Sequence, residues 1–148
     1  MPHESPKPAV DAFIDLLNRS LVGEPVDPFS IYDENVHYER HGLGPNQVNT
    51  DTLAEARVKL LPPEVLAWLT PRPGSGLYPI DYIEEGNRAV VILKGRVTVR
   101  NIPYNNTYFF LFEVRNGKIV RGLEDLDGSL SLRCLFNVHL EEENAAGS

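Results

Sequence analysis

The chain has 148 residues, of which 42% are hydrophobic, and this is enough for one globular domain with its own core. A net charge of −7 argues against nucleic acid and anionic membranes as partners, because both need a clustered basic face. One cysteine, Cys134, excludes an intrachain disulfide, and no apolar run approaches the length of a membrane span. We therefore expect a cytoplasmic protein with a single domain over residues 1–148, ordered from about 8 to 136 with flexible termini.

The first half of the chain predicts mainly helices. Apolar residues recur at helical spacing from Pro8 to Val22, and Gly23 ends the pattern. Asp27 is the expected N-cap of a short helical turn that runs to about Tyr32. In chain order we then expect a strand over Val36–Arg40 and a loop over 42–49. Two further helices follow, one from Thr50 or Asp51 to Leu61 and one over Glu64–Leu69.

The second half predicts an antiparallel meander. We expect four strands over Leu77–Glu85, Arg88–Arg100, Tyr104–Arg115 and Lys118–Asp127, with Ser129–His139 extending or capping the sheet. Asn116-Gly117 is the strongest hairpin signal, because a type I′ turn needs positive φ at both central residues. Helices followed by long antiparallel strands indicate an α+β class, with helices packed on one face of a curved sheet. The concave side of such a sheet is a natural pocket.

A carboxylate on the last strand is the principal candidate for catalysis. Period-two alternation places Glu124 on one face with Val120, Gly122 and Leu126, and Asp125 on the other. Burial in an apolar pocket would raise the pKa of Glu124 toward the range that suits a general acid or base. The alternatives are a surface carboxylate, or a β-bulge after Glu124 that turns Asp125 inward instead.

Arg40 and two tyrosines are the expected partners of this carboxylate. An inward Arg40 would pair with Glu124, lowering its pKa, or would hold a developing oxyanion; the alternative is an exposed arginine at a strand end. Tyr104 or Tyr108 could donate a hydrogen bond to a substrate oxygen, although both could equally be core aromatics. The expected pocket walls are Tyr38, Trp68, Phe110 and Phe112.

No metal or other cofactor is expected. His37, Glu39 and His41 follow one another along one strand face, so they are strung out along it and do not converge on one point. A solvated face explains this pattern.

Two segments carry a resemblance to a known family. The run NGKIVRGLEDLD resembles the closing hairpin of the nuclear-transport-factor-2-like cone fold, in its SnoaL-like branch, and IYDENVHYERHG is similar to the entry into its first strand. The resemblance covers about residues 8–136 and implies a cone-shaped curved sheet.

Phe109 and Leu111 alternate on the outer sheet face, where we expect a homodimer contact. The family includes ketosteroid isomerases, epoxide hydrolases and polyketide cyclases, and also members that only bind or dimerise.

The resemblance also implies roles for individual residues. Glu124 matches the position of a pocket aspartate in the epoxide hydrolases, and Arg40 matches the base of the ketosteroid isomerases, a role that arginine cannot fill. Phe13 lies near the position at which the ketosteroid isomerases carry an oxyanion-binding tyrosine. The epoxide hydrolases have an Arg-x-Asp motif on a central strand, and the corresponding Arg96-Val97-Thr98 lacks the acid. We therefore expect a cofactor-independent isomerase or cyclase that acts on a polycyclic or terpenoid- or alkaloid-like small molecule. The alternatives are a noncatalytic binding or dimerisation module, and a hydrolase or dehydratase in which Glu124 activates water.

Overall fold

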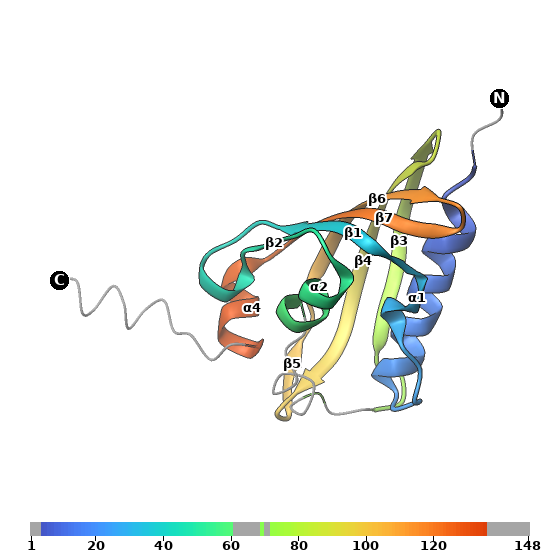
Figure 1. Ribbon diagram of the computed structural model, residues 1–148. Coiled ribbons are helices and arrows are strands. Elements are labelled where there is room, and N and C mark those ends of the chain that lie inside the picture. The colour runs from blue at the N-terminus through green and yellow to red at the C-terminus, as the bar shows by residue number, and fades with distance from the viewer. Residues whose placement is uncertain (1–3, 61–68, 70–71, 136–148) are drawn as a thin grey trace.

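The computed structural model describes residues 4–60, 69 and 72–135, and it confirms the predicted α+β class (Figure 1). Its helices are α1 (Lys7–Leu21), η1 (Pro28–Ile31), η2 (Gly44–Asn46), α2 (Leu53–Leu60) and α4 (Gly128–Leu135). Its strands are β1 (Tyr32–Arg40), β2 (Val48–Thr50), β3 (Gly76–Glu85), β4 (Arg88–Val99), β5 (Ile102–Tyr104), β6 (Thr107–Arg115) and β7 (Lys118–Leu126). The helix expected at Glu64–Leu69 lies, apart from its last residue, outside the described residues. Among the described helices, none is long and apolar enough to cross a membrane.

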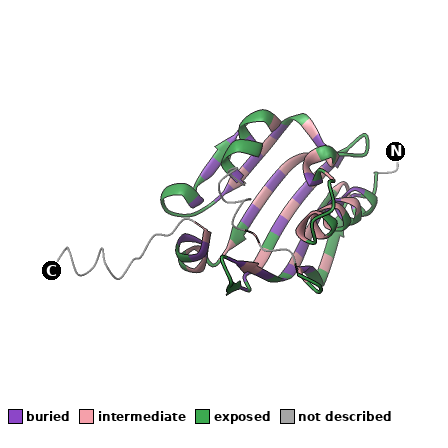
Figure 2. Ribbon diagram, turned by 90° about the horizontal axis from the view of Figure 1, so that it is seen from below, coloured by how far each residue is buried: buried purple, intermediate pink, exposed green. Residues whose placement is uncertain are grey.

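The strands form one sheet in the order β2-β1-β7-β6-β4-β3, with β5 added to β4. Its named strand pairs are antiparallel except β1 with β7, which run parallel. The sheet curls around its concave face, and α1 and α2 lie on that side of it (Figure 1). Buried residues alternate with more exposed ones along the strands, as the period-two pattern predicts (Figure 2).

Helix α1 packs onto the sheet through its apolar stripe and one polar clamp. Phe13 makes edge contacts with Phe110 and Phe112, at ring-centroid distances of 5.9 and 5.4 Å. Asn18 accepts a hydrogen bond from the Leu77 N–H at 2.7 Å and donates one to its carbonyl at 3.0 Å. The side-chain amide therefore satisfies both main-chain groups of Leu77, and this fixes the helix at the start of β3.

The β6–β7 hairpin forms as predicted, with positive φ at Asn116 (53°) and Gly117 (74°). A residue from the other end of the chain also holds this turn. The Glu4 carboxylate accepts the backbone N–H of Asn116 at 2.7 Å and that of Gly117 at 2.5 Å. The segment before α1 is thereby attached to the tip of the hairpin.

The expected continuous strand Tyr104–Arg115 was wrong. Positive φ at Arg100 (50°) and Asn101 (64°) turns the chain back, so that β5 pairs with β4. The Asn106 side chain then accepts the N–H of Thr107 at 2.8 Å and that of Asp127 at 3.0 Å, which separates β5 from β6. This interruption depends on a contact with a residue far along the sequence, so local pattern did not predict it.

A β-bulge in β7 corrects one face assignment. The register passes from Glu113–Arg121 to Val114–Ile119, so β7 carries an extra residue at Val120. Ile119 is therefore buried, while Val120, expected on the Glu124 face, is only half-buried. Beyond the bulge the alternation of Gly122, Glu124 and Leu126 follows the prediction.

Two elements were not anticipated. The expected loop 42–49 contains the start of β2, which pairs with the end of β1. The segment expected to extend or cap the sheet forms helix α4 up to Leu135, and the Asp127 carboxylate accepts the N–H groups of Ser129 at 3.1 Å and Leu130 at 3.3 Å as its N-cap.

Candidate active site

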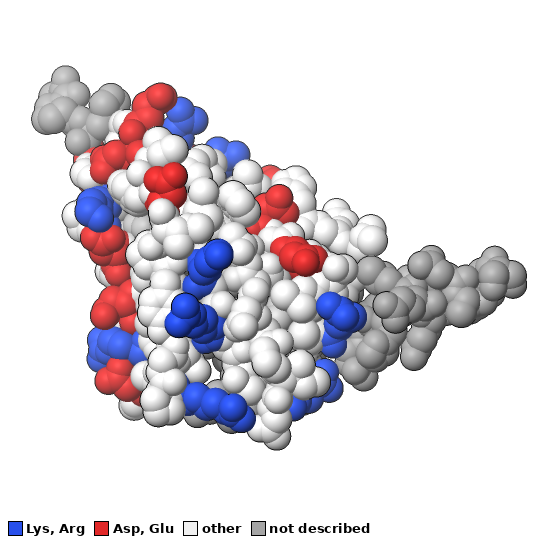
Figure 3. Space-filling model, turned by 180° about the vertical axis from the view of Figure 1, so that it is seen from behind, with Lys and Arg blue, Asp and Glu red and all other residues white. Residues whose placement is uncertain are grey.

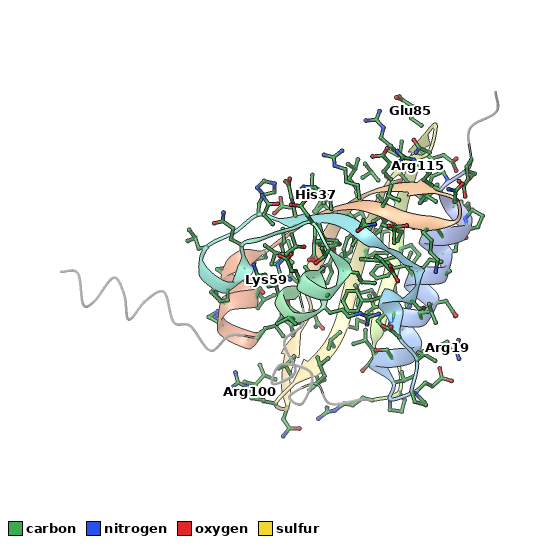
Figure 4. All side chains as sticks on the ribbon, in the orientation of Figure 1. Arg19, His37, Lys59, Glu85, Arg100 and Arg115 are labelled. Atoms are coloured by element: carbon green, nitrogen blue, oxygen red, sulfur yellow. The ribbon has the colours of Figure 1, made fainter. Side chains whose placement is uncertain are left out.

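A cavity of about 130 Å³ lies between the concave sheet face, α1 and η1. One part of its wall is apolar and comes mainly from Phe13, Leu17, Phe29, Leu77, Val97 and Phe110. Polar side chains gather elsewhere on the wall: Tyr32, Tyr38, Arg40, Tyr104, Tyr108, Glu124 and Ser131. In contrast, the labelled charged residues Arg19, Glu85, Arg100 and Arg115 lie at the periphery of the molecule (Figure 4).

Glu124 is the acid of this cavity. In register it lies between Arg40 on β1 and Phe110 on β6, so that three adjacent strands form this part of the wall. The residue is only 7% exposed, and its Oε1 is 3.4 Å from Nη1 of Arg40. Burial raises the pKa of Glu124, and the opposing effect of Arg40 is smaller. The expectation that direct pairing lowers this pKa was therefore wrong, because desolvation outweighs the ion pair.

Arg40 is buried and held mainly by main-chain carbonyls. Its Nε donates to the carbonyl of Asn46 at 2.8 Å, Nη2 donates to that of Pro45 at 3.3 Å, and Nη1 donates to that of Leu60 at 3.3 Å as well as to Glu124. Four of the five N–H groups of the guanidinium thus have acceptors among the described residues. Because Leu60 belongs to α2, Arg40 also ties this helix to β1.

The two predicted tyrosines lie together in the wall. Tyr104 accepts a hydrogen bond from Nδ2 of Asn106 at 3.0 Å, and Tyr108 and Ser131 line the same cavity. Burial raises the pKa of both tyrosines, so both stay protonated at neutral pH.

Tyr32 and Ser131 line the cavity although no site role was predicted for them. Tyr32 stacks on Tyr38 at a centroid distance of 5.9 Å, and burial raises the pKa of both. Tyr32, expected at the end of a helical turn, instead starts β1, where Val36, Tyr38 and Arg40 continue the same buried face. Ser131 lies on the buried side of α4, and the apolar spacing of that segment was its only signal.

The remaining predicted site residues divide into three cases. Phe110 lines the cavity, whereas Phe112 is fully buried and does not. The ring of Phe112 stacks on that of Phe110 at a centroid distance of 5.1 Å. Asp125, the alternative acid, is exposed on the opposite sheet face, so the structure does not bring it into the cavity. Trp68 lies outside the described residues.

His37 takes part in a separate cluster on the other side of β1. Its Nδ1 is 2.7 Å from Asp51 and its Nε2 is 2.7 Å from Glu39. These hydrogen bonds to Glu39 and Asp51 raise the pKa of His37. Within the described ranges, no group of His, Cys, Asp and Glu has an arrangement that would hold a metal ion.

No protein-family model matches this sequence, and no curated protein sequence matches it either. Solved structures do match. An NTF2-like protein of unknown function from Burkholderia pseudomallei K96243 aligns over 89% of this chain and 98% of its own, with 19% identity and a TM-score of 0.68. TerC, co-crystallised with polyporic acid, aligns over 88% and 96% respectively, with 21% identity and a TM-score of 0.62. A LEH-like epoxide hydrolase from M. tuberculosis aligns over 94% and 92%, with 16% identity and a TM-score of 0.59. The chain therefore has the nuclear-transport-factor-2-like cone fold that the sequence resemblance implied.

Proposed function

We propose that the protein is a cofactor-independent isomerase or cyclase that transfers protons on a small cyclic metabolite of the polycyclic, terpenoid or alkaloid kind. Glu124 would take a proton from one position of the substrate and return it at another. Arg40 and Tyr104 or Tyr108 would hold the oxygen on which charge develops. The aromatic wall would orient the ring system for the transfer.

The observation that carries this proposal is the burial of Glu124 in a cavity wall. A carboxyl group whose pKa is raised by desolvation is closer to neutrality, where proton transfer in both directions is efficient. Arg40 keeps this carboxyl in place, because its other hydrogen bonds fix the guanidinium to the main chain at Pro45, Asn46 and Leu60. The presence of an epoxide hydrolase among the matched structures is consistent with catalysis in this fold.

A proton-transfer assay tests the proposal without a known substrate. 2-Hydroxycyclohexanone carries a hydroxyl group and an exchangeable C–H beside its carbonyl, and NMR in D₂O follows the incorporation of deuterium at that carbon. We expect the wild type to exchange deuterium faster than buffer alone. In Glu124→Gln this acceleration should be smaller by at least about 100-fold, the usual contribution of a general base. Glu113→Gln, on the outer sheet face, is the matched control and should retain it.

The rival function is a noncatalytic ligand-binding module. It predicts that cyclic ligands bind and that exchange stays at the buffer rate in every variant. The convergence of Arg40, Glu124 and Tyr108 on one cavity favours the enzyme, because a purely apolar guest would not require a buried ion pair at that position. Equal exchange in wild type and Glu124→Gln would remove Glu124 from the mechanism.

The proposal includes a homodimer through the outer sheet face. Ile83, Val90, Leu111 and Leu123 form a row across four adjacent strands of this face. Nearby, Phe109 is 49% exposed. Seen from behind, the molecule has a broad uncharged area broken by a few basic side chains, with acidic ones along one margin and a few more on the upper part of the face (Figure 3). Phe109→Lys with Leu111→Lys should convert a dimer to a monomer in light scattering, and a wild type that is monomeric at high concentration would contradict this part.

A further inference from the structure

Asn46 is a fully buried polar residue that joins two elements far apart in the sequence. It ends η2, the turn between β1 and β2, and is 0% exposed. Its Oδ1 accepts the hydroxyl proton of Ser131 at 2.7 Å, and its Nδ2 donates to the carbonyl of Gly128 at 3.0 Å. Both partners lie in the first turn of α4, which packs beside the chain between β1 and β2 (Figure 1). The side-chain amide therefore attaches η2 to the start of α4 with its acceptor and its donor both in use.

The main chain of the same residue holds the arginine of the cavity. The Asn46 carbonyl accepts Nε of Arg40 at 2.8 Å, the shortest of the hydrogen bonds described for this guanidinium. The preceding carbonyl, that of Pro45, accepts Nη2 at 3.3 Å. The contact between Nη1 and Oε1 of Glu124 is longer, at 3.4 Å. The position of η2, more than the carboxylate itself, therefore sets where the positive charge lies.

A glycine allows η2 to fold back against the end of β1. Gly42 lies just beyond this strand, and a Cβ atom there would come within 2.7 Å of Cβ of Asn46, closer than side-chain carbons approach. The turn is thus held from two sides, by the backbone of Gly42 and by α4. Both contacts fix the carbonyl that binds Arg40.

We propose that Asn46 is a positioning residue: its carbonyl holds Arg40 beside Glu124, and its side-chain amide holds that carbonyl in place by binding α4. Asn46 is not among the described residues that line the cavity, so it acts through Arg40. Arg40 lowers the pKa of Glu124 against the effect of burial, so its placement affects how readily this carboxyl gives up a proton. The inference rests on the proposed function only in taking Glu124 as the group that moves the proton.

Other titratable groups also lie around Glu124. They are Asp125 on the opposite sheet face and the tyrosines of the cavity wall, Tyr32, Tyr38, Tyr104 and Tyr108. Burial raises the pKa of these tyrosines, so they carry no charge at neutral pH. The hydrogen bonds of the Asn46 side chain go to Gly128 and Ser131, and neither of these titrates. A substitution at Asn46 therefore reaches Glu124 through Arg40.

Asn46→Ala tests the proposal, because it removes both bonds to α4 and keeps the carbonyl that binds Arg40. The titration of Glu124 is followed by NMR of the full chain with ¹³C-labelled glutamate carboxyls, and Glu124→Gln identifies its signal. We expect the pKa of Glu124 to be higher in Asn46→Ala than in the wild type, because a guanidinium that moves away lowers it less. Deuterium exchange into 2-hydroxycyclohexanone at pH 7 should be about tenfold slower, since the groups at the reacting centre are less well placed. Its rise with pH should also begin at a higher pH.

Asn87→Ala is the matched control, because this side chain also donates to a main-chain carbonyl, that of Val114 at 2.9 Å, near the β6–β7 turn. It should lower the thermal midpoint and leave the pKa of Glu124 unchanged. Gly42→Ala gives a second measurement if Asn46→Ala does not fold. The added methyl group displaces Asn46 with its amide intact, and the pKa of Glu124 should again be higher.

The outcomes separate this inference from the proposed function. A pKa of Glu124 that is unchanged or lower in a folded Asn46→Ala or Gly42→Ala overturns the inference and leaves the proposed function standing. A wild type that exchanges deuterium no faster than buffer contradicts the proposed function alone, because the titration of Glu124 needs no turnover.

Discussion

The ring of Tyr38 packs closely against the backbone of Gly122. A Cβ atom at position 122 would come within 2.5 Å of Cε2 and 2.7 Å of Cδ2 of this ring, closer than side-chain carbons approach. The two residues face each other in the parallel pairing of β1 and β7, two positions before Arg40 and Glu124. The absence of a side chain at Gly122 thus allows Tyr38 to pack on the sheet beside the ion pair.

Gly122→Ala should destabilise the fold by about 1–3 kcal/mol, because the added methyl group forces Tyr38 away from the sheet. Urea denaturation measures the change in the free energy of unfolding. Gly128→Ala is the control, since a Cβ at that position would be 3.6 Å from its nearest neighbour, an ordinary contact. Equal stability of the two variants would mean that Tyr38 moves aside without cost.

Arg40→Met should destabilise the protein by about 3–5 kcal/mol, because it leaves Glu124 buried without its cation and removes donors from three carbonyls. Arg40→Lys should recover little, since an ammonium group cannot reproduce the planar fork. Adding Glu124→Leu to Arg40→Met should recover part of the loss. Chemical denaturation of the wild type, the two single variants at Arg40 and the double variant checks this, with Arg19→Met at an exposed position as control. A double variant less stable than Arg40→Met would contradict it.

Glu124 should make stability fall as the pH rises. Its pKa is raised in the folded state above the ordinary value of 4.5, so between these two values the folded protein holds more protons than the unfolded chain. The stability associated with the protonated form is present below pH 4.5 and is lost as the pH rises through the folded pKa. Glu124→Gln lacks this pH-dependent contribution to the free energy of unfolding. The difference in unfolding free energy between the two proteins should therefore shift in favour of Glu124→Gln from pH 4 to pH 8, and a shift in the opposite direction would show that Arg40 lowers the pKa.

His37 should contribute stability in its charged form. The hydrogen bonds to Glu39 and Asp51 raise its pKa above 6.5, so its contribution is present below that pH and is lost as the pH rises through the folded value. The thermal midpoint of His37→Gln should lie below that of the wild type at pH 5.5, and the gap should narrow by pH 9. NMR titration of the His37 ring gives the pKa directly. His41→Gln, at the neighbouring histidine directly after β1, is the control for the substitution itself.

Period-two patterning and turn chemistry predicted much of this architecture. Arg40 lies on the buried face of β1 with Val36 and Tyr38, and Asn116-Gly117 forms the expected hairpin turn. These features depend on residues that are neighbours in sequence, so that local rules are sufficient to predict them.

The unpredicted features depend on distant partners. Asn106 interrupts a strand because its amide binds the main chain of Asp127, and the bulge at Val120 depends on how β6 pairs with β7. Ser131 enters the cavity wall only because α4 folds back against Asn46.

The contact of Glu4 with the β6–β7 turn has a practical consequence for work with the protein. Its carboxylate occupies the two backbone N–H groups at the hairpin tip, more than one hundred positions away in sequence. Trimming of the first few residues would expose those N–H groups to solvent, and a bulky affinity tag fused close to Glu4 would compete for the same space. Expression vectors with a long spacer or a C-terminal tag should therefore preserve the hairpin best.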